Sequence, residues 1–124
     1  MENEKSERRK HRRAYFSVRD NIIGHFRLLT EIENNFHAPI LNLSRGGLHF
    51  TLNKKELVKP RSGDRLRLIK IEGEDLLEKV FDAELEIKWV LGHASLSQIG
   101  YGCKFITISP ESLNCMIEFI DSKY

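Results

Sequence analysis

Alternation of hydrophobic and polar residues dominates this sequence from Tyr15 onward, and it is clearest between residues 81 and 91. The hydrophobic positions of that run are Phe81, Ala83, Leu85, Ile87, Trp89 and Leu91. A period of two is typical of strands that bury one face, so Trp89 is predicted to point into the core. Similar runs predict strands within residues 22–29, 36–43, 48–52, 65–69 and 100–108. Polar turns separate the runs, which indicates a β-barrel or a β-sandwich.

The period of the hydrophobic pattern changes once, near the C-terminus. Ser109 is a plausible N-cap, and Pro110 suits the first position of a helix. The hydrophobic residues that follow at helical spacing are Leu113, Met116, Ile117 and Ile120. One apolar stripe at this spacing predicts a helix over about residues 110–122 that packs against the sheet.

The first 13 residues differ from the rest of the chain in charge. They hold six Lys or Arg and three Glu, a net charge of +3, so with +2 overall the other 111 residues carry −1. Residues 2–12 include no apolar side chain that a core could bury. We therefore predict a flexible basic arm, residues 1–13, that meets an anion, and one folded domain, residues 14–124.

Several classes of function are disfavoured by the sequence. No apolar segment is long enough to span a membrane or to act as a signal peptide, so we expect a cytoplasmic protein. Cys103 and Cys115 lack CxxC spacing and are expected to be reduced thiols with a packing role. The five histidines have no metal-binding spacing, and no catalytic triad, P-loop or carboxylate pair stands out. We expect no metal, no cofactor and no enzyme.

The arm contains the arginine cluster Arg8-Arg9-Lys10-His11-Arg12-Arg13. The guanidinium group is a planar fork of donors that can pair with phosphate oxygens or with O6 and N7 of guanine. In an extended segment, residues four apart share a side, so two arginines at this spacing can hold one ligand. Arg9 with Arg13 satisfies the spacing, and so does Arg8 with Arg12.

A second polar motif is the turn Asn42-Leu43-Ser44-Arg45-Gly46-Gly47. Asn42 and Ser44 are two apart, so they point to the same side and offer oxygens to the N1–H and N2–H₂ donors of guanine. Gly46 and Gly47 permit a positive φ and leave room for a ring. The alternative is an ordinary hairpin turn in which Asn and Ser bond the local backbone.

Together the two motifs resemble those of the PilZ domain, a bacterial receptor family for cyclic di-GMP that carries RxxxR before a barrel and [D/N]xSxxG on a following hairpin. Residues 84–90 and 102–105 are similar to two strands of that family. The resemblance implies a mainly β fold, a six-stranded antiparallel β-barrel with a C-terminal α-helix. The residues flanking the arginines favour Arg9 and Arg13 as the motif pair.

The resemblance also implies roles for individual residues. The candidate ligand-binding residues are Arg8, Arg9, Arg13, Asn42, Ser44, Gly46 and Gly47. Arg9 and Arg13 would hold phosphates and guanine edges, and Gly47 would make room. Asn42 and Ser44 would meet a guanine. An arginine at the position of Arg8 implies a stacked pair of ligand molecules as a hypothesis. Lys104 is interpreted as an exposed strand lysine.

The function implied is capture of cyclic di-GMP between arm and hairpin, with ordering of the arm as the signal to a partner protein. The resemblance suggests motility, pilus, exopolysaccharide or virulence control, and the sequence does not identify the partner. The sequence leaves the oligomeric state open, and a homodimer is one alternative. One alternative is a ligand-independent adaptor for protein contact. Another is a nucleic-acid binder of low specificity, against which the charge of −1 on the folded domain counts.

Overall fold

The computed structural model describes residues 12–29, 34–78, 80–92 and 97–123, with the side chain of Val80 excepted. Most of the predicted arm, including Arg8 and Arg9, lies outside the described residues. The elements are β1 (Arg13–Tyr15), the 3₁₀ helix η1 (Val18–Asp20), β2 (Ile23–Leu29), β3 (Asn34–Ser44), β4 (Gly47–Asn53), β5 (Arg65–Glu72), β6 (Val80–Leu91), β7 (Gln98–Ile108) and the helix α2 (Pro110–Ser122). Each predicted strand and the predicted helix is present.

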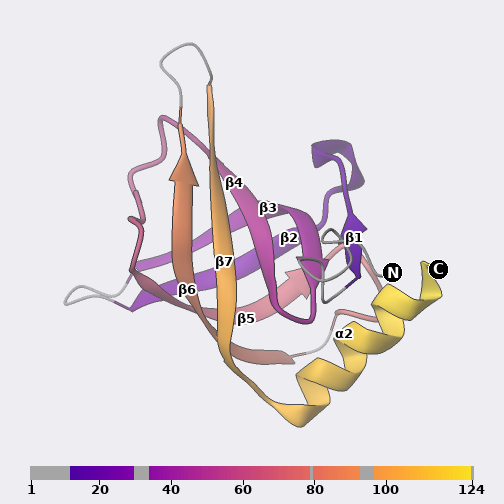
Figure 1. Cartoon of the computed structure of the whole chain (residues 1–124). Coiled ribbons are helices and arrows are strands. Elements are labelled where there is room, and N and C mark those ends of the chain that lie inside the picture. The colour runs from indigo at the N-terminus through magenta and orange to yellow at the C-terminus, as the bar shows by residue number, and fades with distance from the viewer. Residues whose placement is uncertain (1–11, 30–33, 79, 93–96, 124) are drawn as a thin grey trace, which may run out of the picture.

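The strands form a closed antiparallel barrel (Figure 1). Six strands follow one another in the order β3-β2-β5-β6-β7-β4, and pairing between β3 and β4 closes the ring. Closure leaves no free edge among these six strands, which removes the usual site of unwanted strand pairing. The prediction of a six-stranded barrel is therefore confirmed, and the sandwich alternative is wrong.

The short strand β1 is an addition to the six-stranded barrel. It pairs with the end of β3, where Arg13 lies opposite Ser44 and Tyr15 lies opposite Asn42. Because side chains alternate along a strand, Arg13 and Tyr15 project to one side of β1 and Ala14 to the other. The last residue of the predicted arm and the two residues after it thus pair with the hairpin that carries the second motif.

Large side chains from distant strands fill the barrel. Phe26, Phe50 and Tyr101 are almost completely buried, and the ring of Phe50 lies 4.8 Å from each of the other two, centroid to centroid. These residues come from β2, β4 and β7, so the contacts that fill the barrel are made by residues far apart in the sequence. Aromatic pairs at this separation stabilise a core beyond the area that they bury.

The C-terminal helix packs against the barrel, as the sequence predicts, but the set of residues that it buries differs from the predicted apolar stripe. Ser109 caps it by accepting a hydrogen bond from the backbone N–H of Ser112 at 3.2 Å. The buried residues of α2 are Ser112, Met116, Phe119 and Ile120, while Ile117 is only half-buried. The prediction that Ile117 belongs to the buried stripe is therefore wrong, because Phe119 takes the central place and its ring lies 5.7 Å from that of Phe16.

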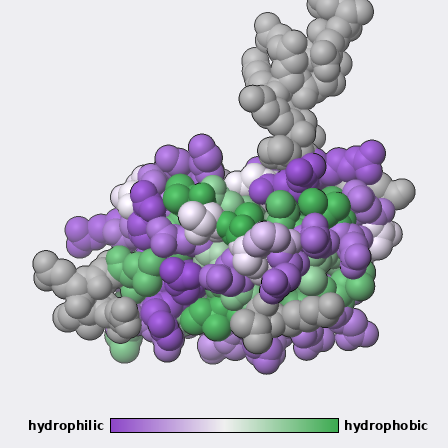
Figure 2. Space-filling model, turned by 90° about the horizontal axis from the view of Figure 1, so that it is seen from below, coloured by the Kyte–Doolittle hydropathy of each residue, from purple (hydrophilic) through white to green (hydrophobic). Residues whose placement is uncertain are grey.

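Seen from below the view of Figure 1, hydrophobic residues appear as separate patches among hydrophilic ones (Figure 2).

None of the helices in the described part of the chain combines the length and the apolar character that crossing a membrane requires. Across residues 12–29, 34–78, 80–92 and 97–123, no three His, Cys, Asp or Glu side chains are grouped so as to hold a metal ion.

The two cysteines are free thiols in different surroundings. Cys103 is buried on β7, and burial raises its pKa to about 12, whereas Cys115 on α2 is half-buried. Since the thiolate is the reactive form, Cys103 is expected to be inert at pH 8. Ellman's reagent should titrate one thiol quickly in the native protein and the second only after unfolding in guanidinium. Two fast thiols in the native protein would contradict the buried position of Cys103.

Candidate functional site

The strand registers place the second motif on one outer surface of the barrel, which we call the motif face. Its first row crosses five strands and consists of Tyr15, Asn42, His49, Gly102 and Trp89, each opposite the next. A second row, one pleat away, consists of Arg13, Ser44, Gly47, Lys104 and Glu86. The barrel therefore assembles residues from β1, β3, β4, β6 and β7 into one continuous surface.

Arg13 and Asn42 link the two sequence motifs directly. The Nη1 group of Arg13 donates a hydrogen bond to Oδ1 of Asn42 at 2.7 Å. Asn42 is only 7% exposed, while Arg13 is half-buried above it. A charged donor of this kind makes a stronger hydrogen bond than a neutral one. The last arginine of the cluster, Arg13, thus contacts the first residue of the second motif, Asn42.

His49 and Trp89 extend the motif face beyond the residues named from the sequence. Nδ2 of Asn42 lies 2.8 Å from Nδ1 of His49, and the ring of His49 meets that of Trp89 edge-on at 4.8 Å between centroids. Burial lowers the pKa of His49 below its usual value of 6.5, and the positive charge of Arg13 lowers it further. The row Arg13, Asn42, His49 and Trp89 is therefore one connected set of contacts.

Ser44 takes part in the turn itself. Its Oγ accepts hydrogen bonds from the backbone N–H groups of Gly46 at 3.2 Å and Gly47 at 3.3 Å, and donates to the carbonyl of Gly47. These bonds are those of the ordinary hairpin turn weighed as an alternative. Ser44 is 1% exposed. It lies on the same face as Asn42, but its hydroxyl is already hydrogen-bonded to the backbone of the turn.

Gly47 is required by the packing of the barrel. Gly46 and Gly47 could adopt a positive φ, but the positive-φ glycines of the described residues are Gly63 and Gly73. A Cβ atom at Gly47 would instead overlap the carbonyl oxygen of Cys103 on the neighbouring strand β7. Glycine is thus the residue that lets β4 and β7 approach here.

Arg12, which precedes β1, and Arg13, its first residue, contact different parts of the molecule. Nη1 of Arg12 lies 3.9 Å from Oδ1 of Asp121 on α2, and both side chains are 65% exposed. Arg13 reaches Asn42 on the motif face. Of the predicted arginines, Arg13 is therefore brought to the second motif, Arg12 is directed to the helix, and Arg8 and Arg9 lie outside the described residues.

Trp89 does not occupy the core, contrary to the prediction. Its side chain is 41% exposed, and Leu91 is 66% exposed. Ile87 pairs with Cys103 and Trp89 with the next residue of β7, Gly102, so β6 contains one extra residue, Lys88. A bulge of this kind reverses the alternation of faces, which directs Trp89 outward onto Gly102. Lys104 is exposed, as predicted.

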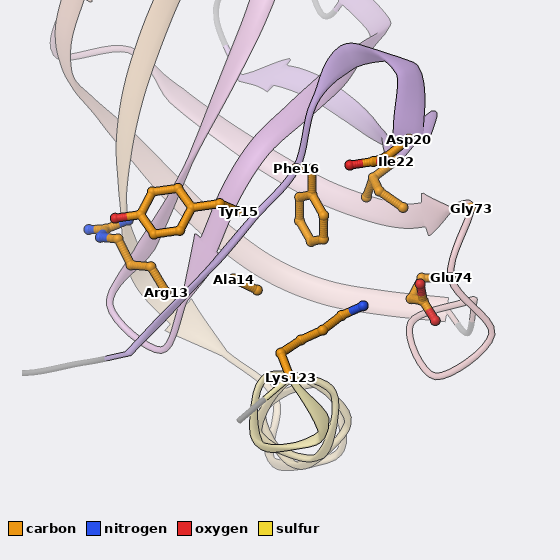
Figure 3. Close-up of a pocket in the computed structure, with 9 residues that line it drawn as sticks. All are labelled: Arg13, Ala14, Tyr15, Phe16, Asp20, Ile22, Gly73, Glu74 and Lys123. Carbon is orange, nitrogen blue, oxygen red and sulfur yellow. The ribbon is translucent and has the colours of Figure 1, made fainter.

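A cavity of about 410 Å³ lies beside β1 (Figure 3). Ala14 and Phe16 point toward it, whereas Arg13 and Tyr15 extend to the other side of the strand. Asp20, Glu74 and Lys123 also line this cavity. Two carboxylates against the one ammonium group of Lys123 give these side chains no excess of positive charge for an anionic ligand, so the motif face, to which Arg13 extends, is the better candidate.

Sequence reasoning missed His49 and misplaced Trp89. The signal for His49 was present, because a two-residue turn at Arg45-Gly46 pairs Ser44 with Gly47 and hence Asn42 with His49. No sequence pattern indicated that the Trp89 side chain points outward, since the bulge at Lys88 depends on how β6 pairs with β7.

Comparisons with known proteins agree with this fold. The model of the PilZ domain matches residues 7–122. Among solved structures, the inhibitor of motility MotI/DgrA of Bacillus subtilis is 17% identical over 94% of this chain and 50% of its own, with a TM-score of 0.67. The PilZ domain of Escherichia coli YcgR with c-di-GMP is 15% identical over 93% of this chain and 90% of its own, with a TM-score of 0.67.

MrkH, described as a c-di-GMP-dependent transcription regulatory factor, is 15% identical over 93% of this chain and 50% of its own, with a TM-score of 0.66. The chain thus spans about half the length of MotI and MrkH. No curated protein matches the sequence.

Proposed function

Because the chain belongs to the PilZ domain family, we propose that it is a receptor for cyclic di-GMP and that it holds the ligand on the motif face. The observation that carries the proposal is the 2.7 Å hydrogen bond from Arg13 to Asn42, which joins the two motifs in one place. The PilZ domain of E. coli YcgR, whose structure contains c-di-GMP, supports the proposal.

The chemistry of the motif face suits a guanine-containing phosphate. Arg13 carries a planar fork of N–H donors, the group that pairs with a phosphate or with the Hoogsteen edge of guanine. Oδ1 of Asn42 has a second lone pair beside the one that Arg13 uses, so it can accept from a guanine N–H. The exposed ring of Trp89 offers a surface for stacking. Three kinds of contact therefore meet across one row.

The position of Arg13 supports Arg9 and Arg13 as the operative motif pair. In an extended arm, Arg9 shares a side with Arg13, whereas Arg8 shares a side with Arg12, which is directed to α2. Arg8 remains a proposed contact for a second, stacked ligand molecule. Ordering of the arm over the barrel, and transmission of that change to a partner protein, also remain proposals.

The proposal predicts saturable binding that changes the fluorescence of the chain's single tryptophan, Trp89. Its ring is partly exposed and contacts His49, so a ligand on the motif face alters its surroundings. Cyclic di-GMP should be titrated with fluorescence and calorimetry in parallel, with GTP as the competing nucleotide, and calorimetry reports one or two ligands per chain. Absence of heat and of a fluorescence change at high micromolar ligand would overturn the receptor proposal and favour the adaptor.

A further inference from the structure

The hydrogen-bond pattern fixes the protonation state of His49. A guanidinium group only donates, so the atom of Asn42 that faces Arg13 is the amide oxygen. The atom that faces His49 is then the amide nitrogen, which also donates. Nδ1 of His49 must therefore be an unprotonated acceptor, and the imidazole is neutral with its proton on Nε2. This assignment follows from the donors and acceptors alone.

The surroundings of His49 favour that neutral form. The titratable or charged groups on the strands around it are Arg13 and Tyr15 on β1, Glu86 and Lys88 on β6, and Lys104 on β7, while β3 presents the neutral amide of Asn42. Lys88 lies 3.1 Å from Glu86, so these two charges largely offset each other. Arg13 and burial both lower the pKa of His49. Protonation is therefore expected only below about pH 6.5.

We propose that His49 is a positioning residue for the ligand site, which holds the Asn42 amide with its oxygen toward Arg13 and makes binding of cyclic di-GMP weaken in acid. The inference rests on the proposed function of the motif face. When Nδ1 of His49 gains a proton, it becomes a donor that faces the donor Nδ2 of Asn42. The amide must then separate from His49 or rotate, and rotation would turn its NH₂ group toward Arg13 and the guanine donors.

A competing effect has the opposite sign. The added positive charge on His49 attracts an anionic ligand, but a half-exposed site in physiological salt screens that attraction. Rotation of the Asn42 amide would withdraw Oδ1, the acceptor that faces both Arg13 and the guanine N–H groups. This loss acts at contact distance, so it is expected to outweigh the screened attraction. If the neutral form alone binds well, the affinity falls with the neutral fraction of His49 as the pH drops through its pKa.

The test is calorimetric titration of cyclic di-GMP at pH 7.5 and pH 5.0 with the full chain. For the wild type we expect the dissociation constant to be higher at pH 5.0, by at most about 30-fold, the limit that the usual histidine pKa of 6.5 sets. His49→Gln retains an acceptor oxygen for Asn42 but does not titrate, so, whatever its affinity at pH 7.5, the ratio of its dissociation constants at pH 5.0 and pH 7.5 should be close to one. His25→Gln, on β2 beside Glu72, removes a histidine outside the motif face and should keep the wild-type profile.

The outcomes separate the two proposals. Affinity that is unchanged or higher at pH 5.0, or a loss that His49→Gln shares, would overturn the role of His49 while leaving the receptor function intact. No binding by the wild type at pH 7.5 would overturn both. Nitrogen NMR of the unliganded wild type gives a readout that needs neither ligand nor variant: the neutral Nε2–H tautomer supports the inference, and an Nδ1–H tautomer or a charged ring at pH 7.5 overturns it.

Discussion

Replacing Arg13 by alanine is expected to weaken cyclic di-GMP binding by about 100-fold, which corresponds to about 2.7 kcal/mol. Each hydrogen bond from a charged donor contributes about 1.5–3 kcal/mol, and the fork of Arg13 can make more than one to the ligand. The substitution also removes the group that meets Oδ1 of Asn42 on the motif face. Calorimetry at neutral pH and constant salt measures the loss directly.

Arg12→Ala is the matched control, because it removes the same charge from the adjacent residue. Arg12 is directed to Asp121 at 3.9 Å, and such an exposed pair contributes about 1 kcal/mol or less to stability. Binding by Arg12→Ala should stay within about threefold of wild type. Equal losses in the two variants would indicate attraction by net charge alone, and a larger loss for Arg12→Ala would favour Arg8 and Arg12 as the motif pair.

Replacing Gly47 by alanine is expected to destabilise the fold by about 2–4 kcal/mol and to lower the melting temperature by about 10 °C. The new Cβ atom would overlap the carbonyl oxygen of Cys103, and backbone on a paired strand moves only if the β4–β7 ladder shifts with it. Thermal and urea unfolding followed by circular dichroism, without ligand, measure the effect.

Gly92→Ala is the companion variant for this experiment. Gly92 is exposed, and a Cβ atom there would meet Ile99 at an ordinary 3.7 Å, so the free energy of unfolding should change by about 0.5 kcal/mol or less. If Gly47→Ala proves as stable as Gly92→Ala but loses cyclic di-GMP binding, the glycine serves the ligand, as the sequence motif implied, and the packing argument is wrong.

Local patterns predicted the elements of this fold well. The alternation in residues 81–87 marks the buried positions correctly, and Ser109 and Pro110 mark the start of α2. The error at Ile117 is small, since Phe119 lies within the same two turns and the stripe is only rotated. Such features depend on residues a few positions apart, so the sequence carries them directly.

The candidate site was predictable in part. The motif positions Asn42 and Ser44 share a face with Arg13, as a strand period of two requires. Their hydrogen-bond partners were not predictable, because Asn42 contacts Arg13 and His49 while Ser44 bonds its own turn. Whether a polar side chain is available to a ligand depends on which donors and acceptors the fold places around it.

The strand and helix content, the hairpin turn and the identity of the two motifs follow from the sequence, because these features depend on neighbours along the chain. The tertiary structure decided that Arg13 lies over Asn42, that Trp89 faces outward and that Gly47 serves the contact between β4 and β7. The reason is that barrel closure and the bulge at Lys88 set pairings between residues far apart, and one extra residue in a strand reverses its faces.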